Sequence, residues 1–117
     1  MSDESDSALV SEMLDAARRI AAYIDAGGAP EFLQQTIVYD AVCMNLLRLG
    51  ECARFLGPET RSRLPTVPWP DLVNLRNRLA HGYETLKPAL LWSIASVNVP
   101  DVAALLAGLA DPSEGGT

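Results

Sequence analysis

The sequence predicts an all-α protein, a four- to five-helix up-and-down bundle. Apolar residues recur at spacings of three and four along several segments, which is the pattern of helices that pack on one face. No useful length alternates apolar and polar residues with a period of two, as a half-buried strand would. A length of 117 residues, 49% of them hydrophobic, suits one core. We therefore expect a single domain over residues 1–117, with an ordered core of about 8–110.

The first half of the chain predicts two helices. Residues 7–26 place one apolar stripe on a helix, formed by Leu9, Met13, Ala17, Ile20 and Ile24. Gly27–Gly28 is the expected stop. A second helix is predicted from Pro30, a residue suited to a first turn, to Leu56, with Gln35–Thr36 as the candidate position for a break. Because this helix is apolar on much of its circumference, we expect it to be central.

The second half is divided by prolines. A short helical turn is predicted over residues 59–64, followed by an extended connector in "PTVPWP", because residues before proline avoid the helical region. Pro70 and Asp71 open a helix that should run to about His81 and stop at Gly82.

Two further helices are predicted near the C-terminus. Pro88 can start one through Ser96, and Pro100 can start a last one to about Ala110. The polar tail, residues 111–117, is expected to be disordered.

The cysteines and the single histidine limit the chemistry. Cys43 and Cys52 are nine residues apart, which places them on opposite faces of a helix, so we expect two reduced thiols and no disulfide. One histidine in the chain excludes a zinc site of ordinary composition, and no metal or cofactor is expected. The acidic N-terminus lacks the apolar run of a signal peptide, and no window of about 18 uncharged apolar residues occurs. These observations predict a cytoplasmic protein with no membrane partner.

The charge is unevenly distributed. The net charge of −6 argues against indiscriminate nucleic-acid binding, yet six arginines lie within residues 48–78 against three acids. Such a local cationic patch can hold a polyanion with a strong dependence on salt. For any single one of these arginines, a solvated helix face is the better explanation.

The segment "LRNRLAHGYE" concentrates the polar side chains that can do chemistry. Asn77 and His81 are four residues apart and share one face of a helix. Arg76 and His81 are five apart, about 140° from each other on an ideal helix, so one straight helix does not aim both at one small substrate. Two copies facing each other would line a shared groove with both pairs, so the geometry favours a homodimer.

These residue types suit cleavage of RNA without a metal. A histidine can take the proton from the ribose 2′-OH, and an arginine supplies a fixed charge and a fork of donors for the phosphate. From residue types alone, however, a capping and ion-pair arrangement is the commoner explanation of such a helix end. Trp69 and Trp92 are likewise more commonly core anchors than platforms for stacking bases.

"RNRLAHGY" resembles the R-x4-H-x-Y signature of the HepT-like ribonuclease toxins, a branch of the HEPN (higher eukaryotes and prokaryotes nucleotide-binding) superfamily. "YDAVCMNLLRLGECARFL" is similar to the family's long second helix, with Asn45 and Gly50–Glu51 in characteristic positions. "LPTVPWPDLVNLRNRLAHGYETL" resembles its entry into the catalytic helix, and "LLWSIASVNVPDVAALLAGL" its closing segment. The resemblance covers roughly residues 8–110, and only "ETLKPAL" after the motif departs from the usual pattern.

The resemblance implies the toxin component of a type VII-like (HepT/MntA-type) toxin–antitoxin pair, a dimeric, metal-independent endoribonuclease. Arg76 and His81 would be the catalytic pair, supported by Asn77. Tyr83 would be the residue that a MntA-like minimal nucleotidyltransferase antitoxin modifies with AMP, which silences the toxin.

Three further residues are candidates for the site. Arg78 and Arg48 are candidate contacts to RNA. Glu51 either orients Arg76 or His81 from the neighbouring helix or is an exposed helix residue.

Two other functions stay open at this point. One is a non-catalytic HEPN module that binds a nucleotide or a partner nucleotidyltransferase. The other is a helical dimerisation domain in which the motif stabilises the dimer.

Overall fold

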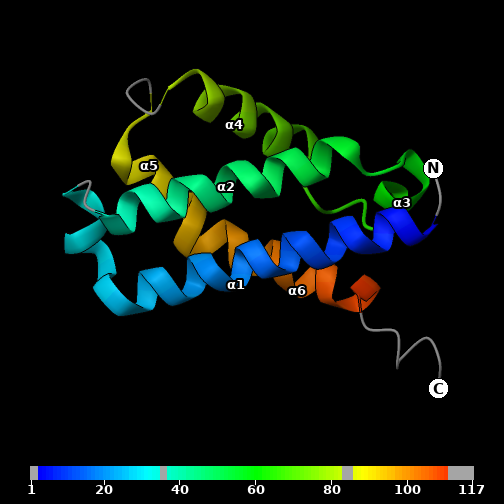
Figure 1. The fold of residues 1–117 in the computed structure, drawn as a ribbon, viewed down its shortest axis with the longest axis horizontal. Coiled ribbons are helices and arrows are strands. Elements are labelled where there is room, and N and C mark those ends of the chain that lie inside the picture. Colours follow the sequence, from blue (N-terminus) through cyan, green and yellow to red (C-terminus); the bar gives the residue numbers. More distant parts are fainter. Residues whose placement is uncertain (1–2, 35–36, 83–85, 111–117) are drawn as a thin grey trace.

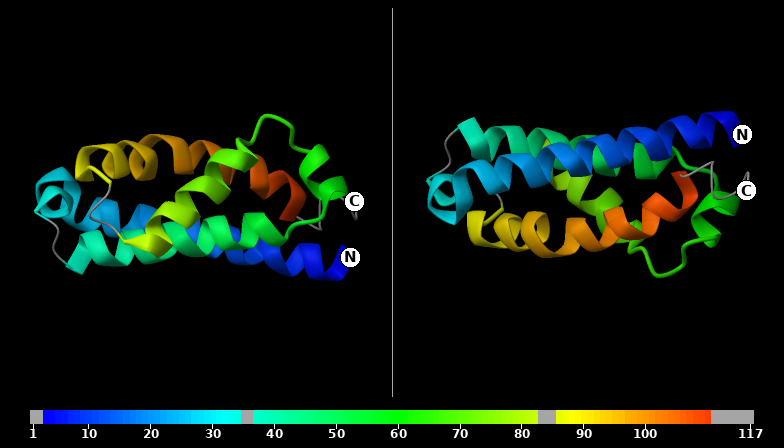
Figure 2. Two further views of the ribbon diagram at one scale, coloured as in Figure 1. Left: turned by 90° about the horizontal axis from the view of Figure 1, so that it is seen from above. Right: turned by 90° about the horizontal axis from the view of Figure 1, so that it is seen from below.

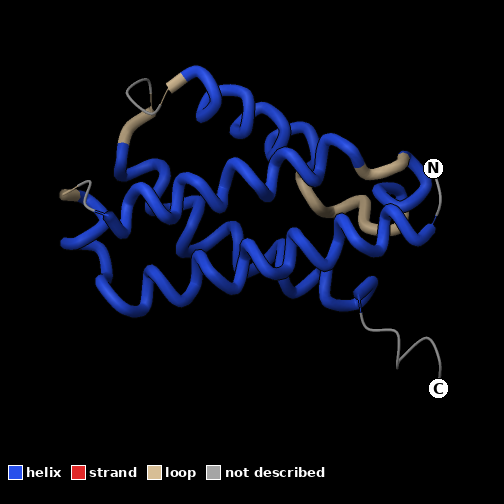
Figure 3. The backbone as a smooth tube through the Cα atoms, viewed as in Figure 1, coloured by secondary structure: helices blue, strands red, loops and turns tan. Residues whose placement is uncertain are grey.

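The computed structural model describes residues 3–34, 37–82 and 86–110, and every regular element within these ranges is a helix (Figures 1 and 3). In chain order the helices are α1 (Asp3–Leu33), α2 (Ile37–Phe55), α3 (Pro58–Ser62), α4 (Trp69–His81), and a C-terminal helix made of α5 (Pro88–Ser93), η2 (Ile94–Asn98) and α6 (Val99–Ala110). Four long helices and the single turn α3 confirm the predicted all-α bundle.

The packing order places α2 in the middle. Helix α1 packs along α2 and α6, and α4 packs on α2. Figure 2 shows that α4 crosses the bundle obliquely, whereas the C-terminal helix runs along its length. The prediction of a central second helix is confirmed, because eight of its residues are buried: Tyr39, Val42, Cys43, Asn45, Leu46, Leu49, Gly50 and Ala53.

Helix α1 begins earlier than predicted. It starts at Asp3 because Asp6 is buried and ties this end to α3, accepting hydrogen bonds from the Gly57 N–H at 3.4 Å and from the Thr60 hydroxyl. The predicted stop coincides with a kink at Gly28, whose φ of 71° is not helical. One further helical turn follows the kink and ends at Leu33. The candidate break at Gln35–Thr36 lies outside the described residues.

Trp69 fixes the start of α4. Its side chain is buried, and its indole N–H lies 3.0 Å from the Leu64 carbonyl oxygen and 3.2 Å from that of Arg61. Trp92 is partly buried, with its ring centroid 5.5 Å from that of Phe32. Both tryptophans therefore serve the core, as expected from the sequence.

The C-terminal part corrects one prediction. Pro100 does not start a separate helix, because the chain continues from α5 into α6 through the π turn η2, in which the Val99 N–H donates to the Ile94 carbonyl. The wider turn makes room for the proline ring, which also has no N–H to donate. The helix Pro88–Leu109 is long and apolar enough to cross a membrane, with a mean hydropathy of 1.6 over an 18-residue window, although Asp101 interrupts it. Core helices of water-soluble proteins meet the same criterion. The tail beyond residue 110 lies outside the described residues.

Candidate active site

Helix α4 carries the motif predicted to be functional. Leu72 and Leu79 are buried on its inner side, while Asn77, Arg78 and His81 are exposed. The helix ends after His81 because Gly82 adopts a φ of 130°, a conformation that favours glycine. The inner leucines therefore fix which side of α4 presents the polar residues.

Gly50 sets the distance between α2 and α4. A Cβ atom at this position would lie 2.5 Å from the Arg76 Cβ and 2.5 Å from the Leu72 carbonyl oxygen. Only a residue without a side chain allows this approach. The contact brings the backbone of Arg76 directly beside the helix that carries Glu51.

Glu51 and Arg76 form an ion pair across this close contact. The Arg76 Nε lies 2.6 Å from the Glu51 Oε1, and the two side chains are 25% and 36% exposed. Neither atom has an aligned hydrogen-bond partner among the described residues, so charge attraction holds them together. Of the two alternatives for Glu51, the structure places it against Arg76 and does not leave it as a solvated helix residue.

Two further side chains contact the members of this ion pair. The Asn77 Oδ1 accepts a hydrogen bond of 3.1 Å from Arg76 Nη1. Arg54, one turn after Glu51, lies 3.6 Å from the same carboxylate oxygen, and its guanidinium is 4.9 Å from the centre of the Phe55 ring. No role for Arg54 or Phe55 was predicted from the sequence; the spacing of three residues between Glu51 and Arg54 was the available signal.

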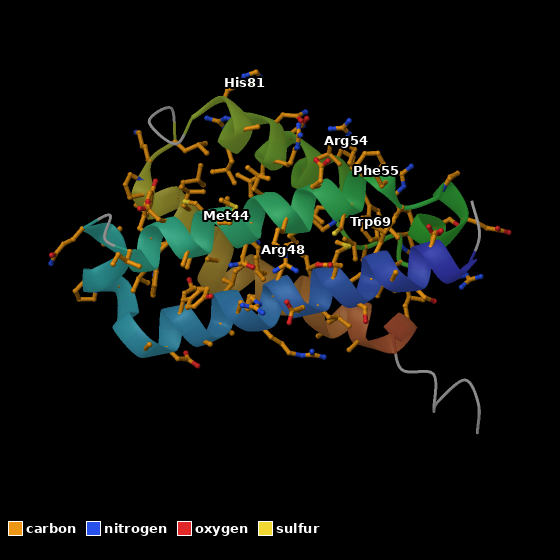
Figure 4. The ribbon with its side chains drawn as sticks, viewed as in Figure 1. Met44, Arg48, Arg54, Phe55, Trp69 and His81 are labelled. Atoms are coloured by element: carbon orange, nitrogen blue, oxygen red, sulfur yellow. The ribbon has the colours of Figure 1, made fainter. Side chains whose placement is uncertain are left out.

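His81 lies apart from this ion pair. Figure 4 shows it at the end of α4, on the outside of the bundle. Because α4 is a regular helix through His81, the angle of about 140° between residues 76 and 81 holds, and Arg76 is turned toward α2. One chain therefore does not bring the two side chains to one point.

Arg48 does not join the group. It lies on the α1 side of α2 (Figure 4), where its guanidinium pairs with Glu12 and, at 3.4 Å, with Asp15, and donates to the Asn45 Oδ1 at 2.8 Å. The hydrogen bond to Glu12 raises the pKa of Arg48, and the hydrogen bond from Arg19 lowers the pKa of Asp15. Arg78 is exposed on α4, and Tyr83 lies outside the described residues.

The all-helical bundle agrees with the architecture of the HEPN superfamily, and comparison with protein families assigns the chain to a ribonuclease-type branch of it. A family model described as "Ribonuclease HepT-like" matches residues 13–108. The chain belongs to this HepT-like family.

Curated relatives agree with this assignment. "Putative RNase MJ1380" of Methanocaldococcus jannaschii is 30% identical over 102 residues, which cover 87% of this chain and 94% of the relative. "Putative RNase MJ0127" of the same organism is 31% identical over 61% of this chain and 59% of its own. "Putative RNase TTE0752" of Caldanaerobacter subterraneus subsp. tengcongensis is 24% identical over 62% of this chain and 64% of its own. No solved structure matches the chain.

Proposed function

We propose that this protein is a metal-independent endoribonuclease and the toxin of a type VII-like toxin–antitoxin pair, acting in the cytoplasm as a homodimer. Membership of the HepT-like family and relatives named as RNases support an RNA substrate. The observation that carries the proposal is the Arg76 guanidinium held by Glu51 at 2.6 Å, on the same helix as an exposed His81. An arginine held in place and a free imidazole are the two groups that cleavage by the ribose hydroxyl needs.

The chemistry follows from these two groups. His81 removes the proton of a ribose 2′-OH, and the 2′-oxygen attacks the adjacent phosphorus. The bond to the 5′-oxygen of the next nucleotide breaks, giving a 2′,3′-cyclic phosphate and, after protonation, a 5′-hydroxyl end. Arg76 donates to the phosphate oxygens and stabilises the charge of the transition state. Asn77 and Glu51 restrain Arg76 while it does so.

Incubation of the purified protein with bulk RNA in EDTA tests this mechanism. Products with 2′,3′-cyclic phosphate ends are expected from the parent, and neither Arg76→Ala nor His81→Ala should produce them. If both variants retain full cleavage and full inhibition of growth, the assignment is wrong. Intact mass is measured first, because an increase of one or more AMP units would mean that the preparation is silenced.

Regulation would act on Tyr83, two residues after His81 in the sequence. A MntA-like nucleotidyltransferase would transfer AMP from ATP to the phenolic oxygen and release pyrophosphate. The added phosphate would repel the RNA backbone and compete for Arg76 and Arg78. Tyr83→Phe should keep cleavage nearly intact and abolish silencing; AMP on the Phe variant would show that another residue is modified.

A non-catalytic HEPN module that binds a nucleotide or a nucleotidyltransferase is the second candidate. It is favoured by one observation, that Arg76 and His81 of a single chain do not converge. It predicts an unmodified parent that binds the partner protein and leaves RNA intact in EDTA.

A further inference from the structure

One aromatic side chain at the end of α2 is exposed beside the Glu51–Arg76 ion pair. Phe55 is 49% exposed, whereas Trp69 and Trp92 serve the core. Glu51 and Phe55 are four residues apart, so they share one face of α2. A single exposed apolar side chain needs no explanation. The neighbours of Phe55, and not its exposure alone, indicate a role.

Arg54 connects Phe55 to the ion pair. Its guanidinium carbon lies 4.9 Å from the centre of the Phe55 ring, and its Nη1 lies 3.6 Å from the Glu51 Oε1. The Arg76 Nε approaches the same oxygen to 2.6 Å, so two arginines share one carboxylate, and no other described acid pairs with either of them. The cluster therefore carries one uncompensated positive charge in a chain with a net charge of −6. A cation next to an exposed ring is the combination that holds single-stranded nucleic acid, with the cation on a phosphate and the ring against a base.

We propose that Phe55 is a platform on which one unpaired base of the RNA stacks, while Arg54 contacts a neighbouring phosphate. Figure 4 shows Arg54 and Phe55 together near the end of α2, on the side of this helix where α4 lies. The shared carboxylate places both next to Arg76, the residue proposed to bind the scissile phosphate. The stacked base therefore belongs to a nucleotide adjacent to the bond that is cleaved.

The core does not require an aromatic ring at this position. The adjoining Ala53 and Leu56 are buried and fill the interior at this end of α2. Phe55 lies about 160° around the helix from Ala53, with half of its side chain in water. Leucine at position 55 keeps an apolar side chain without a flat π-face, and tyrosine keeps the ring. These two substitutions separate stacking from general apolar contact.

Fluorescence anisotropy with strands that cannot be cleaved tests the platform without any measurement of activity. One probe is a 2′-O-methyl oligouridylate, which has no free 2′-OH, and the other is an oligomer with the same number of phosphates and no bases. The parent should bind the base-bearing strand about tenfold more tightly, because one stacked base contributes about that factor. Phe55→Leu should lose this preference and bind the base-free strand as the parent does, whereas Phe55→Tyr should keep it.

The dependence of binding on salt separates the role of Arg54 from that of the ring. Arg54→Gln should weaken the binding of both strands and reduce the slope of log K against log salt by about 0.7, the value for one phosphate of a single strand. Phe55→Leu should leave the slope unchanged, because it removes no charge. Ile37→Ala truncates a side chain that is 86% exposed at the other end of α2, and this control should bind both strands like the parent.

Several results would overturn the proposal. A parent that binds neither strand or both equally, or a Phe55→Leu variant that keeps the preference, would show that no base stacks on Phe55. A Phe55→Leu variant that binds both strands more weakly and sediments differently from the parent would assign the ring to a contact between protein chains. An unchanged salt slope in Arg54→Gln would overturn the phosphate contact.

The effect on cleavage rests on the proposed ribonuclease function. With unblocked RNA, Phe55→Leu should raise KM about tenfold and leave kcat near the parental value, because the ring binds substrate and transition state alike. A lower kcat with an unchanged KM would overturn this role. A parent without RNase activity would refute the proposed function and leave the anisotropy result to decide whether Phe55 holds a base.

Discussion

Replacing Gly50 with alanine tests how closely α2 and α4 must approach for Arg76 to reach Glu51. The new Cβ would lie 2.5 Å from the Arg76 Cβ and from the Leu72 carbonyl oxygen. Both neighbours belong to or adjoin the backbone of α4, so no side-chain rotation relieves the overlap. To restore ordinary contact, α4 has to retreat by about 1 Å.

The expected cost follows from two opposing effects. Overpacking of this kind costs about 1–3 kcal/mol, whereas alanine gains up to about 1 kcal/mol over glycine inside a helix. The free energy of unfolding should therefore fall by about 1–2 kcal/mol, and each kcal/mol lowers the melting temperature of a domain of this size by about 4 °C. Because a shift of 1 Å can reduce catalysis about a hundredfold, RNA cleavage should fall more steeply than stability.

Urea unfolding followed by circular dichroism measures the change, and Gly108→Ala is the matched control. Gly108 lies within α6, and a Cβ there meets no atom within 4 Å, so the control should keep or slightly gain stability. If Gly50→Ala is as stable as Gly108→Ala, the close approach does not constrain α4 and this explanation of the site is wrong.

Three further results are expected. Asp6→Ala should lower the free energy of unfolding by about 1–3 kcal/mol, because the buried carboxylate accepts hydrogen bonds from Gly57 and Thr60; unchanged urea unfolding would contradict this role. Burial raises the pKa of the Cys43 thiol from 9.0 to about 11, so the unfolded chain loses this proton first. The free energy of unfolding should therefore fall by about 2 kcal/mol between pH 9 and pH 11 because of this group. Urea unfolding at both pH values measures the fall, and Cys43→Ala should show a fall that is smaller by this amount. Glu51→Gln should lower the turnover of RNA at least about tenfold, because it removes the charge that restrains Arg76. Replacing Arg54 as well should recover little of the lost turnover. Full turnover in the Glu51→Gln variant would show that Arg76 needs no such partner.

Local sequence rules predicted most of the helices. The stop at Gly28, the start of α4 next to Trp69 and its end at Gly82 follow from glycine and proline chemistry and agree with the structure. The separate helix at Pro100 was wrong, because a π turn accommodates a proline that would interrupt a regular α-helix. The two cysteines are unpaired, as their spacing predicted.

The site was less accessible to sequence reasoning. Helical spacing places Arg76 and His81 on diverging sides of α4, and this is what the structure has. The partner of Arg76 could not be chosen, because Glu51 lies on another helix and the crossing of α2 and α4 is set by the contact at Gly50. The sequence does not distinguish Arg48 from Arg76 as a candidate contact to RNA. In the structure two acids of α1 pair with Arg48, and this pairing depends on tertiary packing.

The π turn between Ile94 and Asn98 affects how the chain tolerates changes of length. A π turn holds one residue more than an α turn, so it absorbs an insertion locally. Deleting Ser96 together with Pro100→Ala would give a regular helix in which Val102 and Leu106 still face the core. Deleting Ala104 instead would rotate Leu106 by about 100° away from the core. The C-terminal helix thus contains one position where evolution can add or remove a residue without reorienting the hydrophobic interior.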